Sequence, residues 1–343
     1  MPRPGAPTNA CRCQGCDYAT RVSASCVADP GGGSTPALPD CFAPVTPVAP
    51  SDAEATAATI PAGMVDACGI NNVAMQRADA NETILSCLTP DRSAAPLQAS
   101  GRRSVLFLVG DSHAAALSGG MEAAAASRFG LVWVANLCGC SFGASSRPVR
   151  ECADHCGRYI EYVNEGLAAQ LHAGDVVAVS NGAWKMYTAG TSPRSTRSPE
   201  SSHAPAIAAE VAFVETLAAL VASRSASLLL LGDTAVLPRL ANVPICRSPS
   251  LRGTQCSVDE WQWQGWHEAQ AALAARLDRP HVHFLSLWDL LCVRSATGTH
   301  SCGPNIPGTN IMAFFDYDHL SVDGALFVHS FLCHFLYLHA MIA

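Results

Sequence analysis

The chain has few charged residues and almost no lysine. Of its 343 residues 14% are charged, the net charge is −7 at pH 7, and Lys185 is the only lysine. Proteins that hold nucleic acid present clustered basic side chains to the phosphates, and the sequence contains no such cluster. We therefore expect no nucleic-acid partner. Nearly half of the residues (49%) are hydrophobic, so the chain can bury a substantial core.

Long uninterrupted apolar segments are also lacking. Residues 1–30 contain no apolar stretch that could serve as a signal peptide. Residues 325–343 are mostly apolar, but His329, His334 and His339 interrupt them. A membrane span tolerates such side chains poorly, so this segment is predicted to be a buried C-terminal helix.

Cysteine, in contrast, is abundant: the chain has 16, several of them in close pairs. Cys11, Cys13 and Cys16 have no nearby fourth ligand, so we predict disulfides and no metal site. Disulfides indicate the secretory pathway, whether extracellular, at the cell surface or in the Golgi lumen. The sequon Asn81-Glu82-Thr83 agrees with a secreted glycoprotein. Because no signal peptide is visible, we expect either an upstream start or a fragment of a longer, membrane-anchored protein.

The sequence divides into two parts of different pattern. Residues 1–100 are rich in Pro, Gly, Ala and Ser and show little periodicity, which predicts a Cys-rich, irregular N-terminal extension. Residues 101–343 form the second predicted domain, in which short apolar runs alternate with helical stretches. The predicted strands are Val105–Val109, Leu131–Asn136, Asp175–Ser180, Leu228–Gly232 and Val282–Leu287. The predicted helices are His113–Arg128, Cys152–His172, Ala204–Arg224, Val258–Leu277 and Val322–Leu338. This alternation predicts an α/β fold, a three-layer α/β/α sandwich with a mainly parallel five-stranded sheet.

Three residues have the types and placement of a hydrolytic triad. Ser112 follows the first predicted strand at a Gly110-Asp111-Ser112 turn, where a helix N-terminus stabilises negative charge. Asp316 and His319 lie in the loop before the last helix, with the spacing Asp-x-x-His. Serine needs a neighbouring base, and the base needs an orienting carboxylate. Asp318 competes for the orienting role, but as the neighbour of His319 it is expected to be worse placed. The structural alternative makes Ser112 an N-cap and the Asp-x-x-His segment a surface turn.

Other residues at the same sheet edge are candidates for holding the substrate. Acyl transfer needs donors for the oxyanion, and the candidates are the backbone N–H groups of Ser112 and Gly139 and the side-chain amide of Asn181. Asn181 precedes a glycine and also fits an ordinary turn. His113 and Trp184 are candidates for substrate contacts, His113 as a wall of the site and not as the base.

Two segments resemble the SGNH/GDSL hydrolases: Gly110–His113 and Asp316–Ala325 look like the first and last blocks of that family. The resemblance is closest to the SGNH domains of membrane-bound acyltransferases that O-acylate surface glycans. It implies Ser112 as nucleophile, His319 as base and Asp316 as its partner, with no cofactor or metal. It also implies a membrane-bound acyltransferase partner or a missing membrane segment. Two cysteine pairs resemble pairs of the same set: Cys246 with Cys256, and Cys292 with Cys302.

The third block departs from the family pattern. The family has Gly-x-Asn-Asp, whereas this chain has Val179-Ser180-Asn181-Gly182-Ala183-Trp184. We predict a serine-dependent O-acyl esterase or transferase, with acetyl as the acyl group, that acts on carbohydrate through an acyl-Ser112 intermediate. Its partners would be an acylated glycan or a small ester. Two alternatives stay open: a lipid or small-ester hydrolase on the same fold, and a catalytically degenerate glycan-binding module.

Overall fold

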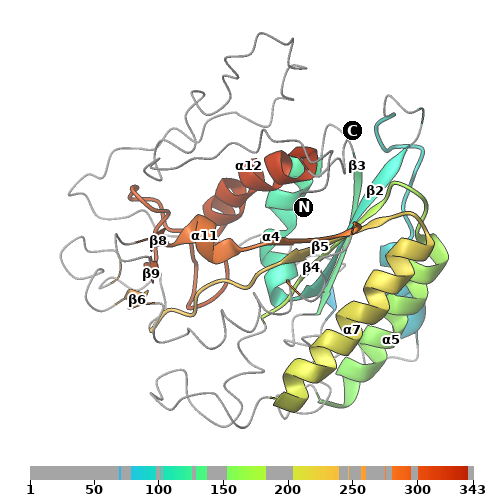
Figure 1. Cartoon of the computed structure of the whole chain (residues 1–343), viewed down its shortest axis with the longest axis horizontal. Coiled ribbons are helices and arrows are strands. Elements are labelled where there is room, and N and C mark those ends of the chain that lie inside the picture. Colours follow the sequence, from blue (N-terminus) through green and yellow to red (C-terminus); the bar gives the residue numbers. More distant parts are fainter. Residues whose placement is uncertain are drawn as a thin grey trace, which may run out of the picture.

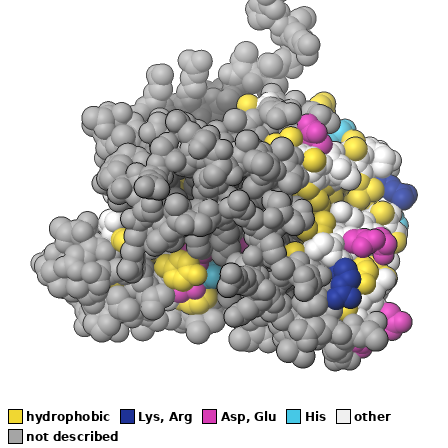
Figure 2. Space-filling model, turned by 90° about the horizontal axis from the view of Figure 1, so that it is seen from below, with side chains coloured by type: hydrophobic (Ala, Val, Ile, Leu, Met, Phe, Trp, Pro, Cys, Tyr) yellow, Lys and Arg dark blue, Asp and Glu magenta, His cyan; other side chains and the backbone are white. Residues whose placement is uncertain are grey.

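The chain forms a parallel sheet covered by helices on both faces (Figure 1). A computed structural model describes residues 69–70, 79–97, 101, 103–125, 129–136, 153–182, 204–238, 246, 256–259, 275, 280–294 and 300–338. Figure 2 shows one side of the molecule, where the charged side chains of the described residues lie scattered among hydrophobic and neutral ones. The described helices include none that is long and apolar enough to cross a membrane.

The sheet has six strands in the order β1-β3-β2-β4-β5-β7, and every neighbouring pair is parallel. Its strands are β1 (Gly69–Ile70), β2 (Ser104–Asp111), β3 (Phe129–Asn136), β4 (Val176–Ser180), β5 (Ser227–Leu231) and β7 (Val282–Leu285). The five predicted strands are all present, and the predicted three-layer α/β/α sandwich is confirmed. Because all strands run in one direction, their carboxyl ends share one edge of the sheet.

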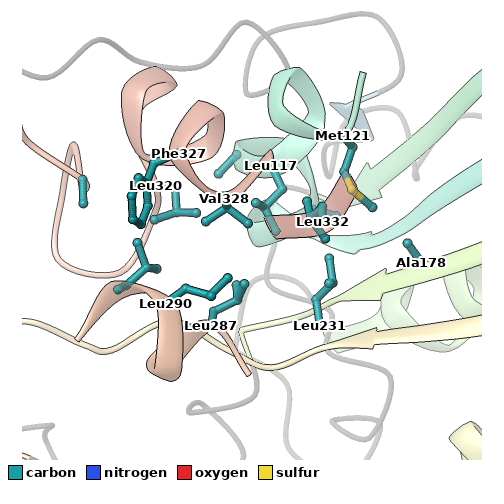
Figure 3. Close-up of a cluster of buried hydrophobic side chains, with 14 of the residues drawn as sticks. Leu117, Met121, Ala178, Leu231, Leu287, Leu290, Leu320, Phe327, Val328 and Leu332 are labelled. Carbon is teal, nitrogen blue, oxygen red and sulfur yellow. The ribbon is translucent and has the colours of Figure 1, made fainter. Parts of the chain in front are cut away.

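Each face of the sheet has its own hydrophobic core. Helices α4 (Ser112–Ala125), α11 (Leu287–Leu291) and α12 (Val322–Leu338) cover one face, and α3 (Ala80–Leu88), α5 (Ala153–Gln170) and α7 (Ala204–Ser223) cover the other. Strand β2 serves both, because successive side chains of a strand point to opposite faces: Leu106 and Leu108 lie in the first core, and Phe107 lies in the second. Figure 3 shows the first core, where Leu117 of α4 and Val328 of α12 meet.

Among the described residues, two elements of this fold come before residue 101. Strand β1 pairs with the end of β3, and α3 packs against α5 through the second core. Burial of Ile84 and Leu88 anchors α3 there. The ordered sandwich therefore takes in residues from the region predicted to be an irregular extension.

A prediction at Val258 is wrong, because β6 (Val258–Asp259) is a strand and not the start of a helix. It pairs with β9 (His300–Cys302), which also pairs with β8 (Val293–Arg294), in a small antiparallel sheet. Pairing with a strand about forty residues away overrides the local helical pattern. Most of the remainder of that predicted helix lies outside the described residues. The predicted end of the strand Val282–Leu287 is also misplaced, because β7 stops at Leu285 and Leu287 starts α11. The Ser286 side chain caps this helix by accepting the N–H of Asp289.

Disulfides hold the region after β5. Cys246 is bonded to Cys256 and Cys292 to Cys302, as the family resemblance implies. The disulfide-bonded cysteines also include Cys87, Cys156 and Cys333. The three cysteines near residue 13 lie outside the described residues.

Candidate active site

Ser112 lies where β2 turns directly into α4. The turn depends on Gly110, whose φ of +154° is unfavourable for residues with a side chain. A Cβ at Gly110 would lie 1.8 Å from the carbonyl oxygen of Ser180 in β4. Glycine thus lets β2 and β4 pair closely up to Gly110, two residues before the helix begins. Ser112 is the first residue of α4, where the helix dipole favours negative charge.

The segment before α12 folds into a tight turn around Asp316. The Oδ1 atom of Asp316 accepts hydrogen bonds from the backbone N–H groups of Asp318 and His319, at 3.0 and 2.8 Å. A bridge between Phe314 and Leu320 closes the turn. The same carboxylate can therefore shape the backbone and reach the imidazole of His319.

The structure brings Ser112, His319 and Asp316 together. The Nε2 atom of His319 lies 2.6 Å from Oγ of Ser112, and its Nδ1 atom lies 2.7 Å from Oδ2 of Asp316. Ser112 and His319 are both buried, whereas Asp316 is half-buried. One imidazole nitrogen thus faces a hydroxyl and the other faces a carboxylate, which is the arrangement of a nucleophile, a base and its orienting group.

The surroundings of His319 favour its protonated form. Burial lowers the pKa of the imidazole, but hydrogen bonds to Asp316 and Asp318 outweigh burial and raise the pKa above its ordinary value. The ring of Phe315 stacks on the imidazole at a centroid distance of 5.6 Å. His319 is therefore a stronger base than a free histidine, and an aromatic ring restricts its orientation.

Asp318 also contacts His319, but Asp316 lies closer and is the hydrogen-bond partner of the ring. Its Oδ1 atom lies 3.0 Å from Nδ1 of His319, close to the distance from Asp316. The tight turn accounts for this contact. Asp316 accepts the backbone N–H of Asp318, and the carboxylate of Asp318 then lies next to Nδ1 of His319. Burial raises the pKa of Asp318, but its close contacts with His113 and His319 outweigh burial and hold the pKa far below its usual range.

His113 is buried and faces carboxylates. Its Nδ1 atom lies 3.0 Å from Oδ1 of Asp233, and its Nε2 atom lies 3.5 Å from Oδ2 of Asp318. Its ring lies 4.8 Å from that of His319. Asp233 follows β5 at the carboxyl edge of the sheet. The rule that selected Ser112 and Asn181, a polar residue directly after an apolar run, would also have selected Asp233.

The structure describes two of the three candidate oxyanion donors, Ser112 and Asn181. Asn181 follows β4 at the same edge and is buried, and its Oδ1 atom has no hydrogen-bond partner among the described residues. Asp111 fixes this edge, because its carboxylate accepts the N–H groups of Gly182 at 2.9 and 3.0 Å and of His113 at 2.9 Å. Gly139 and Trp184, also predicted to belong to the site, lie outside the described residues.

One group of side chains has the spacing of metal ligands. His113, Asp318 and His319 each offer a ligand atom within 4.8 Å of the others. The Nδ1 atom of His113 faces Asp233 and the Nδ1 atom of His319 faces Asp316. Contacts between carboxylates and imidazoles therefore account for this group of side chains.

The chain belongs to the SGNH family: residues 78–332 match the family described as SGNH domain (fused to AT3 domains). The protein is thus an SGNH-type ester hydrolase or acyltransferase. No curated protein matches the sequence.

Solved structures also resemble the chain. The periplasmic domain of a lipopolysaccharide acetyltransferase from Salmonella ser. Paratyphi A is 15% identical with a TM-score of 0.48, and the match covers 77% of this chain and 89% of that one. A protein assigned as an acylhydrolase from Bacteroides fragilis is 11% identical with a TM-score of 0.40, and the match covers 73% of this chain and 93% of that one.

Proposed function

We propose that the protein is a serine-dependent O-acyl esterase or transferase. Its substrate is an acetylated carbohydrate, and the reaction passes through an intermediate in which the acyl group is bonded to Ser112. The observation that carries this proposal is the contact of His319 with both Ser112 and Asp316, at 2.6 and 2.7 Å. Such a contact pair is needed to activate a serine and has no other evident use at a sheet edge.

The geometry supports a two-step reaction. His319 takes the proton of the Ser112 hydroxyl while Oγ bonds to the ester carbonyl carbon, and the carbonyl electron pair moves onto oxygen. When the tetrahedral adduct collapses, the alkoxide leaves with the proton from His319 and the acyl group stays on Ser112. Water or a sugar hydroxyl then attacks the acyl carbon, again with His319 as base. Water gives hydrolysis, and a sugar gives transfer.

The oxyanion would be held by donors from the segments that follow β2, β3 and β4. We assign this role to the backbone N–H of Ser112, to the side-chain amide of Asn181 and to the backbone N–H of Gly139. Asn181 follows β4, whose Ser180 pairs with Gly110 two residues before the nucleophile. The shifted third block would therefore keep an amide near the reacting atoms.

Family membership supports the substrate and partner parts of the proposal. Domains of this family are fused to AT3 domains, and the resemblance noted in the sequence is to enzymes that acylate surface glycans. We propose a membrane-bound acyltransferase as partner and acyl donor. The disulfides support a secretory compartment, because such bonds persist where the environment is oxidising.

A serine-directed fluorophosphonate tests the nucleophile. We expect an adduct on Ser112, with loss of fluoride, in the parent protein and none in Ser112→Ala or His319→Ala. Turnover of an acetylated glycan should fall by roughly 10⁴-fold or more in both variants, because serine and base act as a unit. Ser118→Ala is the matched control, since Ser118 lies in the same helix and bonds only the Ala115 carbonyl in the structure described.

The outcomes separate the parts of the proposal. Full activity of Ser112→Ala would exclude the acyl-serine mechanism. An adduct on Ser112 together with a preference for long-chain esters over acetylated glycans would retain the mechanism and overturn the carbohydrate substrate.

A further inference from the structure

Behind His319 lies a second imidazole that the reaction does not use. His113, Asp233 and Asp318 are all buried, and they continue the line of contacts that starts at the nucleophile. From Ser112 the line runs to His319 at 2.6 Å, to Asp318 at 3.0 Å, to His113 at 3.5 Å and to Asp233 at 3.0 Å. Acid and imidazole alternate along it.

The structure holds His113 too tightly for it to contact substrate. Its side chain is 3% exposed. A Cβ at Gly182 would lie 2.7 Å from its Nε2 atom, so the backbone of the segment after β4 closes off the ring. The carboxylate of Asp111 accepts the backbone N–H of His113. His113 therefore acts on the reaction only through other residues.

Contacts with Thr234 hold the carboxylate of Asp233 and the backbone of Asp318. Thr234 donates its N–H to Oδ1 of Asp233 at 2.7 Å and its hydroxyl to the carbonyl of Asp318 at 2.5 Å. The loop after β5 is thus tied to the loop that carries His319. A second tie runs from the N–H of Leu237 to the carbonyl of Tyr317, at 2.6 Å.

The carboxylates around His113 favour its protonated, positively charged form. Asp111 faces it from the end of β2, Asp233 from the loop after β5, and Asp318 and His319 from the loop before α12. Buried carboxylates are costly unless a positive charge balances them. Burial lowers the pKa of His113, but the charge of Asp233, hydrogen bonds to Asp233 and Asp318, and the charge of Asp111 together raise it well above its ordinary value.

We propose that His113 and Asp233 form a buried positioning pair that holds Asp318 against His319 as a second orienting carboxylate and supplies the positive charge that balances it. The inference rests on the proposed function, because it concerns the base of that reaction. Two carboxylates and one cation then govern the base, whereas the family blocks assign a single carboxylate, Asp316.

Opposite effects on the base follow from the two partners. The positive charge of His113 lowers the pKa of His319, and the close contact with the Asp318 carboxylate raises it. The low-pH side of the kcat/KM profile, here called the acidic limb, reports the pKa of His319. In His113→Gln this acidic limb should therefore move to higher pH, by about one unit. In Asp318→Asn it should move to lower pH, and in the double variant it should return toward the parent. KM should change little, because neither side chain is open to substrate.

The test measures the pH dependence of fluorophosphonate labelling of Ser112 and of kcat/KM in these variants. His172→Gln is the matched control, because His172 is an exposed histidine near the opposite edge of the sheet. Opposite shifts support the pair, since general damage to the site would lower rates without moving the limb in two directions. An unchanged limb in His113→Gln overturns it.

A measurement on the parent protein keeps the inference testable if a variant does not fold. Titration of the imidazole resonances by NMR should show one buried histidine that stays protonated through neutral pH while His319 titrates. A neutral His113 at pH 6 would overturn the inference. If Ser112 is never labelled in the parent, the proposed function fails, and the titration still tests the charge of His113.

Discussion

Gly110 sets the position of the nucleophile. Its Cα lies against the carbonyl of Ser180, and its φ is positive. In Gly110→Ala the new methyl group must push β2 away from β4 two residues before Ser112. We expect a loss of about 3 kcal/mol in the free energy of unfolding, together with a large loss of activity, because the distance from Ser112 to His319 depends on this pairing. Urea unfolding and fluorophosphonate labelling measure the two effects.

Gly101 separates the two causes of that loss. Its φ is +75°, but no atom lies within 4 Å of a Cβ built there. Gly101→Ala should therefore cost only the backbone strain, about 1 kcal/mol, and leave labelling of Ser112 unchanged. Equal losses in the two variants would show that the collision with Ser180 does not matter.

The sequence predicts the residues that touch the reacting atoms better than those behind them. Ser112 and His319 stand out because each follows a recognisable local pattern, a strand ending in Gly-Asp-Ser and an Asp-x-x-His spacing. The contact of Asp318 with His113 joins the loop before α12 to the start of α4, about 200 residues apart, and no local spacing encodes it. The tight turn around Asp316 also places Asp318 where a neighbour in sequence would not be expected.

At the scale of elements, the contact between α4 and α12 aligns the two halves of the site. Helix α4 begins with Ser112, and α12 begins three residues after His319. A Cβ at Gly120 would lie 2.2 Å from the carbonyl oxygen of Ala325, so the two helix backbones approach closely there. The absence of a side chain at one position thus sets how far His319 lies from Ser112.

Adjacent glycines of α4 test this close approach. Gly120→Ala should separate the helices and lower both the unfolding free energy, by about 2 kcal/mol, and the labelling rate of Ser112. Gly119→Ala should raise the unfolding free energy by up to about 1 kcal/mol, because Gly119 is exposed, nothing lies within 4 Å of its Cβ, and alanine favours a helix. Thermal unfolding compares them. The same response in both variants would contradict the packing argument.

Elements were predictable where the pattern is local. The apolar runs of β2, β3, β4 and β5 are continuous because helices cover both faces of the sheet. Strand β6 was missed because a strand of two residues is too short to show a hydrophobic periodicity. It forms only because Val258 pairs with Cys302, which is distant in the sequence. Helix α3 was missed because its surroundings are rich in residues typical of loops.

At the scale of the whole molecule, the two edges of the sheet have different roles. The carboxyl edge carries Ser112 and Asn181, which directly follow β2 and β4, and Asp233, which is the second residue after β5. The opposite edge carries an ion pair between the half-buried Arg92 and the buried Asp175, which immediately precedes β4. Residues that serve chemistry and residues that serve stability are thereby kept at opposite ends of the strands.

This separation predicts that the Arg92–Asp175 pair affects stability and not the reaction. The carboxylate of Asp175 is fully buried and also accepts the N–H groups of Val105 and His172, so it ties the segment after α3 to β2 and β4. Arg92→Met leaves that charge without its cation, which should cost about 3 kcal/mol of unfolding free energy. Arg224→Met, at an exposed arginine that bonds the carbonyl of Ala168, should cost less than about 0.5 kcal/mol. Both variants, measured below their unfolding temperatures, should label Ser112 with the pH dependence of the parent. A shifted acidic limb in Arg92→Met would show that the two edges are coupled, because this arginine lies too far from His319 to act on it directly.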